Sequence, residues 1–452
     1  MILGPHQRLR GLRSRKQAPD PEGAEQVPTE PVSLLGGRGS SVSCDILIRS
    51  VRANRQWQTD SVGALKQPEG LVQRRVVAGG PDDFMTVCHL EVRGSQVEIG
   101  KALASEARDH FDWFPPRAAD PVRNRARRTW FERNWPDQHS RMVGVAAAFG
   151  VDIDDDTIDF ANVMAEPFTA GCSAVWCSSQ VTADGHARVG RNLDFTTRTL
   201  SEMLGAPPQP DEPPVLSRPF VIETYPDKGY AAIVCTVGDL TSCLDGINAK
   251  GLTVAVLADD ESTSLRPSMA PQAGLNEMHI MRYILDTCAT AEEAKEALYG
   301  AKQYDEYAVA HYLIADKEQA FVWERDLHNA EHAVPTDTGT LCVTNHLLFR
   351  DGAGSVPDDT DNEGANDAYR RARILNNGVG GTPVTGDGLW GLLESARADR
   401  RRDEANPDGR VRTLWHGQYD MTGGAVEYEF YLGDDVDGSP CRSPSVSVTL
   451  SA

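Results

Sequence analysis

Three residues in the middle of this sequence have the types and spacing needed to activate a sulfur nucleophile. Cys172 follows Gly171 and begins an apolar run, and Arg191 and Asp194 lie nineteen and twenty-two residues further on. An arginine near a thiol favours the thiolate, while a carboxylate can hold an ammonium group or orient a base. A single cysteine is usually a small buried apolar residue, and Arg191 with Asp194 could be a surface ion pair. Taken together, the three predict a nucleophilic cysteine.

A hairpin is predicted to bring these residues together. Residues 173–181 are apolar enough for a strand, residues 182–185 have the composition of a turn, and residues 186–195 form the return strand. Because a hairpin pairs the start of one strand with the end of the next, Arg191 and Asp194 return to the neighbourhood of Cys172.

The remaining elements indicate the fold class. The pattern predicts further strands at residues 85–92, 219–225, 230–237, 241–247, 252–257, 308–315, 319–324, 339–344, 411–417 and 425–432. It predicts helices at residues 96–111, 120–149, 275–288, 290–300, 363–377 and 387–398. Antiparallel hairpins that alternate with helix pairs indicate an α+β fold rather than a parallel nucleotide-binding sheet.

Other motifs that could carry chemistry lack an essential residue. Residues 94–101 have the wrong glycine spacing for a phosphate-binding loop, and Pro383 replaces the last glycine of a dinucleotide motif. His328 and His332 have helical spacing, but no further ligands complete a metal site there. The sequence has no Gly-x-Ser-x-Gly elbow of a serine hydrolase. We therefore expect neither a cofactor nor a metal.

Composition and charge exclude several classes of partner. The chain has 452 residues and a formal charge of −21, so general affinity for nucleic acid or an anionic membrane is not expected. No apolar run is long enough for a membrane helix, and no signal peptide is recognisable. The nine cysteines are scattered rather than dense, which favours a reducing, cytoplasmic location. A homo-oligomer remains an open alternative.

The first 80 residues differ from the rest of the chain. They carry 12 Lys and Arg against 7 Asp and Glu, and they are rich in proline and glycine without an apolar period. Residues 1–80 are therefore expected to be a disordered extension. Residues 81–171 are expected to pack on the core as a pro-segment, and residues 172–452 to form the catalytic domain.

From about Val87 to its end, the sequence resembles the cysteine-type N-terminal-nucleophile hydrolases, which include choloylglycine hydrolase and isopenicillin N acyltransferase. The resemblance depends on the order and spacing of short motifs rather than on any one of them. These motifs are Gly94-Ser95 with Glu98-Ile99-Gly100, Trp135-Pro136, Gly150-Val151-Asp152, Gly171-Cys172, residues 190–194, Asp245-Gly246-Ile247-Asn248 with Lys250-Gly251-Leu252, residues 282–286, residues 311–316 and Thr344-Asn345-His346.

This resemblance implies a four-layer αββα sandwich and a cysteine that self-cleavage exposes as a new N-terminus. It implies that Cys172 is the nucleophile, cleaved from Gly171, and that Arg191 and Asp194 lie beside it. Asn345 matches the asparagine of the oxyanion site. Arg370 is the match for a later active-site arginine, with Arg371 and Arg373 as alternatives of shifted register.

The expected activity is hydrolysis of a linear amide through a Cys172 acyl-enzyme, with a small-molecule amide or acyl donor as partner. One alternative is an acyltransferase with an amine acceptor, and another is a catalytically silent binding protein on the same scaffold. The sequence departs from choloylglycine hydrolases at residues 257–260, where those enzymes carry another oxyanion asparagine. A backbone N–H or another group would then have to stabilise the oxyanion in place of that asparagine.

Overall fold

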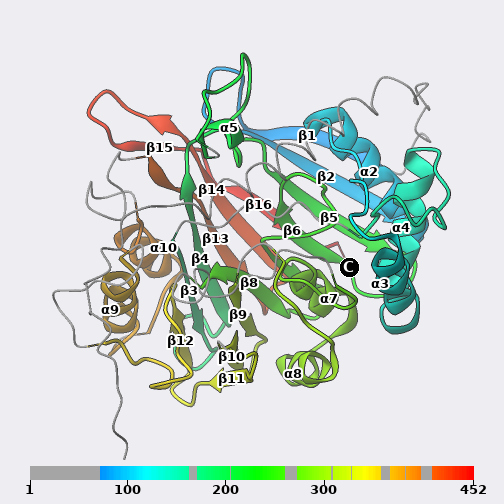
Figure 1. The fold of residues 1–452 in the computed structure, drawn as a ribbon. Helices are drawn as coiled ribbons and strands as arrows, with labels where there is room; N and C mark the ends of the chain where they lie inside the picture. Colours follow the sequence, from blue (N-terminus) through cyan, green and yellow to red (C-terminus); the bar gives the residue numbers. More distant parts are fainter. Residues whose placement is uncertain are drawn as a thin grey trace, which may run out of the picture. The chain divides into compact units, whose positions relative to one another are not determined.

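A computed structural model describes residues 72–161, 171–203, 205–259, 272–306, 309–326, 328–357, 367–381, 383–398 and 410–451. All of them belong to one compact unit that spans Ile48–Ala452. Two β-sheets with helices beside them form this unit (Figure 1).

The larger sheet has nine strands and includes chain from before Cys172. Its order is β1 (Val72–Gly79), β2 (Thr86–Gly94), β5 (Phe220–Pro226), β6 (Ala232–Thr236), β7 (Asp245–Asn248), β8 (Thr253–Ala258), β9 (Ala310–Ala315), β10 (Ala320–Arg325) and β11 (Glu331–Pro335). Strand β2 pairs in parallel with β5, while the other neighbours are antiparallel. The segment before Cys172 is therefore an integral part of this sheet.

The smaller sheet has seven strands and contains the predicted hairpin. Its strands are β12 (Thr340–Val343), β3 (Cys172–Cys177), β4 (Arg188–Thr196), β13 (Val411–Asp420), β14 (Ala425–Asp434) and β15 (Pro440–Arg442), with β16 (Val446–Thr449) also paired with β14. Strands β3 and β4 are antiparallel, with Cys172 opposite Leu193. This register returns Arg191 and Asp194 to the Cys172 end of the hairpin, as predicted.

Helices pack against both sheets. The helices in the described part of the chain are α2 (Gln96–Phe111), α3 (Pro121–Asn134), α4 (Pro136–Ala148), α5 (Leu200–Met203), α7 (His279–Thr287), α8 (Ala291–Gly300), α9 (Ala368–Gly378) and α10 (Gly386–Ser395). Helices α2, α7 and α8 contact the nine-stranded sheet, and α9 and α10 contact the seven-stranded sheet. The α+β class is confirmed. The complete αββα layering stays a prediction that these contacts support.

Local sequence explains where the N-terminal helices begin and end. Ser95 and Glu98 form the predicted capping box, so α2 begins at Gln96. The single helix predicted for residues 120–149 is instead two helices, because Pro136 lacks an N–H and disfavours helical geometry at Trp135. Trp135 ends α3 and Pro136 begins α4.

The predicted boundary of the N-terminal extension at residue 80 is wrong. Residues 72–79 form β1, whose backbone pairs with β2, and the Arg74 side chain donates to Glu106 of α2 at 3.1 Å. The remainder of the predicted extension, residues 1–71, lies outside the described residues.

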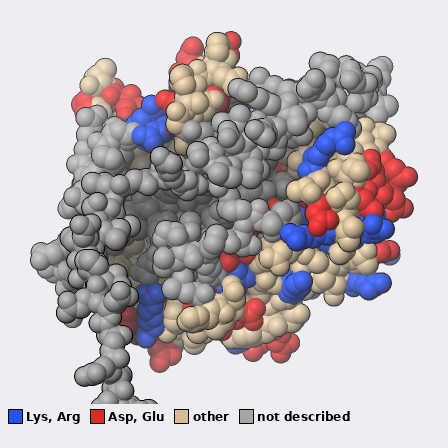
Figure 2. Space-filling view, viewed as in Figure 1, with Lys and Arg blue, Asp and Glu red and all other residues tan. Residues whose placement is uncertain are grey.

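Charge and hydropathy of the described surface bear on the expected partners. Among the described residues on the face in Figure 2, basic side chains lie among acidic ones. No helix in the described part of the chain is long and apolar enough to cross a membrane. That the chain has no nucleic-acid partner stays a prediction.

Candidate active site

The start of β3 holds Cys172 against the charged end of β4. Cys172 and Arg191 are buried, and Nη2 of Arg191 lies 3.9 Å from the Cys172 Sγ. The two side chains lie on the same face of the hairpin because Cys172 and Arg191 sit diagonally across the pair of strands. The structure thus brings the predicted cysteine and arginine together.

The peptide bond between Gly171 and Cys172 lies inside this cluster. The backbone N–H of Asp194 donates to the Gly171 carbonyl oxygen at 2.9 Å, and the same N–H lowers the pKa of the Cys172 thiol through a hydrogen bond. One donor therefore faces both the sulfur and the adjacent carbonyl. Such a donor can stabilise the negative oxygen that forms when the sulfur attacks that carbonyl.

Asn345 lies beside the nitrogen of Cys172, and its amide is held at both ends. Its Oδ1 accepts the Cys172 backbone N–H at 2.7 Å, and its Nδ2 donates to the Ala258 carbonyl at 2.8 Å. The resemblance implied an oxyanion donor, but in the intact chain Asn345 acts as an acceptor for the Cys172 nitrogen. Donation to an oxyanion would require its Nδ2 to leave Ala258.

Arg371, and not Arg370, is the arginine of α9 that reaches this cluster. Its guanidinium donates to the Cys172 carbonyl oxygen at 2.5 Å and to the Asn345 Oδ1 at 2.6 Å, and it is fully buried. Arg370 instead donates to Asp367 at 2.8 Å and to the Arg397 carbonyl at 3.3 Å. The assignment of Arg370 to the site is corrected accordingly.

Helical periodicity could have selected the correct arginine. Ala368, Ala372 and Leu375 form the buried face of α9, and Arg371 lies on the same face. Arg370 is half-buried on a neighbouring position of the helix. The third candidate, Arg373, is also only partly buried.

Asp194 carries a carboxylate with two cross-element contacts. Thr413 of β13 donates its hydroxyl to the Asp194 Oδ1 at 2.5 Å, and the Arg371 guanidinium lies 3.7 Å from Oδ2. Asp194 is 1% exposed, so the guanidinium offsets part of the free energy of burying the carboxylate. The predicted pair Arg191 and Asp194 therefore consists of two residues with separate charge partners.

Asp245 of the nine-stranded sheet is the partner of Arg191. Arg191 Nε donates to the Asp245 carboxylate at 2.8 Å, and both side chains are fully buried. Three further donors from the seven-stranded sheet reach the same carboxylate, namely Trp415 at 3.1 Å, Tyr419 at 2.5 Å and Tyr428 at 3.2 Å. In the sequence, Asp245 is only part of a motif that carries the family resemblance, and that motif assigns it no role.

Burial outweighs the arginines in setting the state of the Cys172 thiol. Removal from water raises the pKa of Cys172, and the nearby Asp194 carboxylate raises it as well. Arg191 and Arg371 lower it, but the net pKa lies above the ordinary value. The expectation of a thiolate is therefore not met in the intact chain, and attack by this sulfur requires a base to take its proton.

The motifs rejected from the sequence do not contribute to the cluster. His332 lies in β11, 3.3 Å from Asp326, and its ring stacks on Phe349. Among the residues that the structure describes, no three His, Cys, Asp or Glu side chains lie close enough to hold a metal ion.

Comparison with known proteins identifies relatives of the chain. The sequence model of the acyl-coenzyme A:6-aminopenicillanic acid acyl-transferase family matches residues 181–430. No curated protein matches. The match begins after Cys172 and includes Arg191, Asp194, Asn345 and Arg371.

Several solved structures are distantly similar. Conjugated bile acid hydrolase from Clostridium perfringens has a TM-score of 0.43 and 14% identity, over 62% of this chain and 92% of that one. Penicillin V acylase from Agrobacterium tumefaciens has a TM-score of 0.38 and 17% identity, over 57% and 83%. A Caenorhabditis elegans ortholog of N-acylethanolamine-hydrolyzing acid amidase has a TM-score of 0.35 and 14% identity, over 55% and 93%.

Proposed function

The chain belongs to the acyl-coenzyme A:6-aminopenicillanic acid acyl-transferase family, and we propose that it is a self-processing amidohydrolase with Cys172 as its nucleophile. The observation that carries this proposal is the set of contacts around one peptide bond. Arg191 faces the Cys172 sulfur, Asp194 N–H faces the Gly171 carbonyl, and Asn345 accepts the Cys172 N–H.

Self-cleavage is the first proposed step. The Cys172 sulfur attacks the Gly171 carbonyl carbon while the thiol proton passes to the departing nitrogen, which gives a thioester and a free α-amine. Gly171 leaves the carbonyl sterically open, and the Asp194 N–H stabilises the negative oxygen. Water then opens the thioester, so residues 1–171 and 172–452 become separate chains.

Amide hydrolysis then uses the same sulfur with a new base. The α-amine of Cys172 has a reference pKa of about 7.7 to 8.0, close to neutral pH, so it can accept the thiol proton that burial otherwise retains. Asn345 and Arg371 hold the Cys172 nitrogen and carbonyl oxygen in place for this transfer. The sulfur attacks the carbonyl carbon of a linear amide, the α-ammonium gives its proton to the departing amine as the C–N bond breaks, and water then releases the acid from the acyl-enzyme.

Acyl transfer is the second candidate function, because the matched family is named for an acyl-transferase. In that case an amine instead of water would take the acyl group from Cys172. Hydrolysis and acyl transfer are distinguished by measuring the products formed from a thioester donor at increasing concentrations of an amine acceptor. A ratio of amide to acid that rises with amine while total turnover stays constant supports transfer from a shared acyl-enzyme.

The deciding experiment is the intact mass of the purified protein under denaturing conditions. Wild-type protein should give two chains that meet at Gly171 and Cys172, and Cys172→Ala should give one chain. The matched control is Cys177→Ala at the other end of β3, which should cleave like the wild type. A wild-type chain that stays intact and still hydrolyses amides would contradict the free-amine mechanism, and an intact, inert chain would favour the binding-protein alternative.

A further inference from the structure

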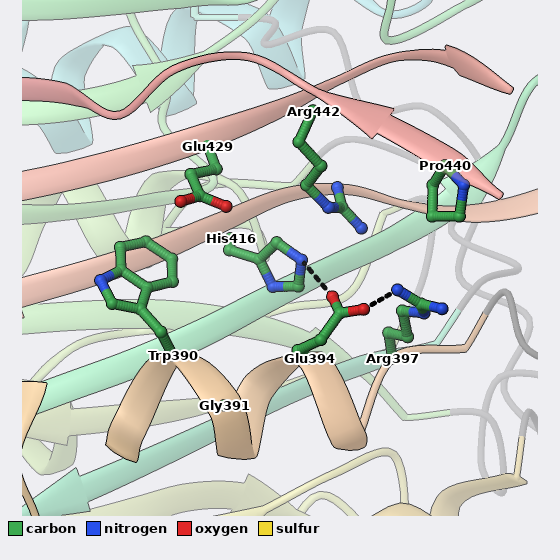
Figure 3. A pocket seen from close by; sticks show the side chains of 8 residues that line it. All are labelled: Trp390, Gly391, Glu394, Arg397, His416, Glu429, Pro440 and Arg442. Carbon is green, nitrogen blue, oxygen red and sulfur yellow. Dashed lines mark ion pairs between the residues drawn. The ribbon is translucent and has the colours of Figure 1, made fainter. Parts of the chain in front are cut away.

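Two carboxylates outside the Cys172 cluster, Glu394 and Glu324, have different kinds of partner. Glu394 is partly exposed, and in a pocket beside α10 it pairs with Arg397 and lies 3.6 Å from His416 (Figure 3). Glu324 of β10 is fully buried and binds backbone N–H groups instead. Because a carboxylate that binds the main chain fixes the path of a loop, Glu324 determines where the loop bound to it lies.

Glu324 binds the loop that follows β12. Its Oε1 and Oε2 accept the Leu348 N–H at 2.8 and 3.0 Å, and Oε2 also accepts the Phe349 N–H at 2.8 Å. The Nδ1 of His311, on the neighbouring strand β9, lies 3.2 Å from Oε1, and His311 is fully buried as well. A buried N–H without an acceptor is unfavourable, so the loop keeps its main chain on this carboxylate.

A ring stack holds the same loop from the next strand. His332 of β11 lies opposite Glu324 in the sheet, and its ring stacks on Phe349 with the ring centroids 4.2 Å apart. Leu347 and Leu348 are buried. The loop is therefore fixed to the nine-stranded sheet by its backbone and by its side chains.

Asn345 lies in this loop, three residues before Leu348. The loop leaves β12, which pairs with the Cys172 strand in the seven-stranded sheet, and then reaches Glu324 in the nine-stranded sheet. The Asn345 amide spans the same two sheets, because it accepts the Cys172 N–H at 2.7 Å and donates to the Ala258 carbonyl of β8 at 2.8 Å. Both bonds require the loop to cross between the sheets at one place.

We propose that Glu324 is a positioning residue for self-cleavage, because it holds residues 344–349 where Asn345 binds the nitrogen of the bond between Gly171 and Cys172. This role rests on the proposed function of Cys172. Glu324 acts only through the main chain of the loop and touches no reacting atom. A displacement of about 1 Å can slow a reaction about 100-fold, so the position of the loop matters to the rate.

Hydrogen exchange in Cys172→Ala, which should remain one chain, measures this positioning without catalysis. In that background, Glu324→Gln should speed exchange of the residue 172 amide at least about tenfold, because a glutamine has one acceptor oxygen and its NH2 group repels the other N–H donors. The Asp194 amide, which donates to the Gly171 carbonyl in the same hairpin, is the internal control and should keep its exchange rate. Unchanged exchange at residue 172, or equal acceleration at both amides, would overturn the proposal.

A milder variant covers the case in which Glu324→Gln does not fold. His332→Leu removes only the stack on Phe349 and its contact with Asp326. In the Cys172→Ala background it should speed exchange of the residue 172 amide about threefold and leave the Asp194 amide unchanged. No change at residue 172 in this variant would contradict the proposal.

Self-cleavage followed by intact mass tests the consequence for the reaction. Glu324→Gln should slow cleavage about tenfold. The matched control Glu331→Gln, half-buried on β11, should slow it less than about twofold, because Glu331 accepts from Gln303 at 3.2 Å and not from the loop. A Glu324→Gln chain that cleaves at the wild-type rate would refute the role. If the wild type does not cleave, the proposed function fails, whereas the exchange measurement in Cys172→Ala still decides whether Glu324 positions Asn345.

Discussion

Four buried charges surround the Cys172 backbone and sulfur, and they form two opposite pairs. Arg191 pairs with Asp245, and Arg371 lies near Asp194. Burying such pairs is unfavourable unless their hydrogen bonds are also satisfied, and clusters of buried charges concentrate at functional sites. Cys172 is held by contacts to its sulfur, its nitrogen and its carbonyl oxygen.

Two adjacent arginines of α9 provide a matched test of the site. Arg371→Lys should slow self-cleavage about 100-fold, because one ammonium cannot hold both the Cys172 carbonyl and Asn345 as the planar guanidinium does. Arg370→Lys should change the rate less than about threefold, since within the described part of the chain Arg370 donates to Asp367 and to the Arg397 carbonyl, outside the cluster. The rates follow from the intact mass over time. Equal slowing in both variants would contradict this assignment.

The Arg191 and Asp245 pair should behave as one unit in stability measurements. Arg191→Gln should destabilise the protein by about 3 kcal/mol because it leaves the Asp245 carboxylate buried without its cation. The double variant Arg191→Gln, Asp245→Asn should be more stable than Arg191→Gln alone, since no net charge is then buried. Urea unfolding of Cys172→Ala, which is expected to stay one chain, and of both single variants and the double variant in that background measures this coupling. Additive losses would show that the pair is not coupled.

The sequence was sufficient to predict which segments meet at Cys172, because the hairpin that joins them is local. Cys172, Arg191 and Asp194 lie on two consecutive strands joined by a short turn. The role of Asp245 could not be predicted in the same way, since its contact with Arg191 crosses between two sheets. The net pKa of Cys172 also depends on burial, which the local sequence does not determine.

Among the elements, those with strong local signals were predicted most accurately. Helix α2 begins and ends where its capping box and periodicity predict. Strands β11, β15 and β16 were not predicted, because they are short and their pairing with other strands stabilises them more than their own residues do. The sequence contains the break at Trp135-Pro136, and the prediction of one continuous helix through it is wrong.

Two N-terminal deletions that differ by only eight residues should differ in stability, because only the longer one removes strand β1. Deleting residues 1–71 should leave the melting temperature within about 2 °C of the wild type, since that segment lacks the apolar pattern of a core element. Deleting residues 1–79 also removes β1, exposes the edge of β2 and breaks the Arg74 contact with Glu106, so the melting temperature should fall by about 4 °C or more. Equal melting temperatures for the two deletions would contradict a structural role for β1.

At the scale of the whole molecule, buried histidines should make unfolding sensitive to acid. Burial lowers the pKa of His279 to about 3, while the unfolded chain has the ordinary value of 6.5. Between these two pH values, His279 therefore binds a proton in the unfolded state but not in the folded state. The contribution of His279 to stability is complete above pH 6.5 and is lost as the pH falls towards 3, by about 2 kcal/mol at pH 5.

The substitution His279→Gln removes the titrating group and can keep both hydrogen bonds that the His279 ring makes. His279 accepts the Asn276 N–H at 3.3 Å and donates to the Ala161 carbonyl at 2.9 Å, and a glutamine amide can do both. Between pH 7 and pH 5, the variant should lose about 2 kcal/mol less unfolding free energy than the wild type, measured by urea titration at each pH. The same loss in both proteins would mean that His279 does not contribute to the acid sensitivity.

The parallel pairing of β2 with β5 determines how the protein recovers from denaturation. In the uncut chain these strands share one polypeptide, so each finds the other at an effective concentration set by the intervening segment. If the chain is cleaved between Gly171 and Cys172 as proposed, the same pairing joins two molecules, and its rate depends on how dilute they are. The covalent link that brings the two strands together in the first folding would then be missing in every later attempt, so we expect the cleaved protein to persist through slow unfolding rather than through efficient refolding.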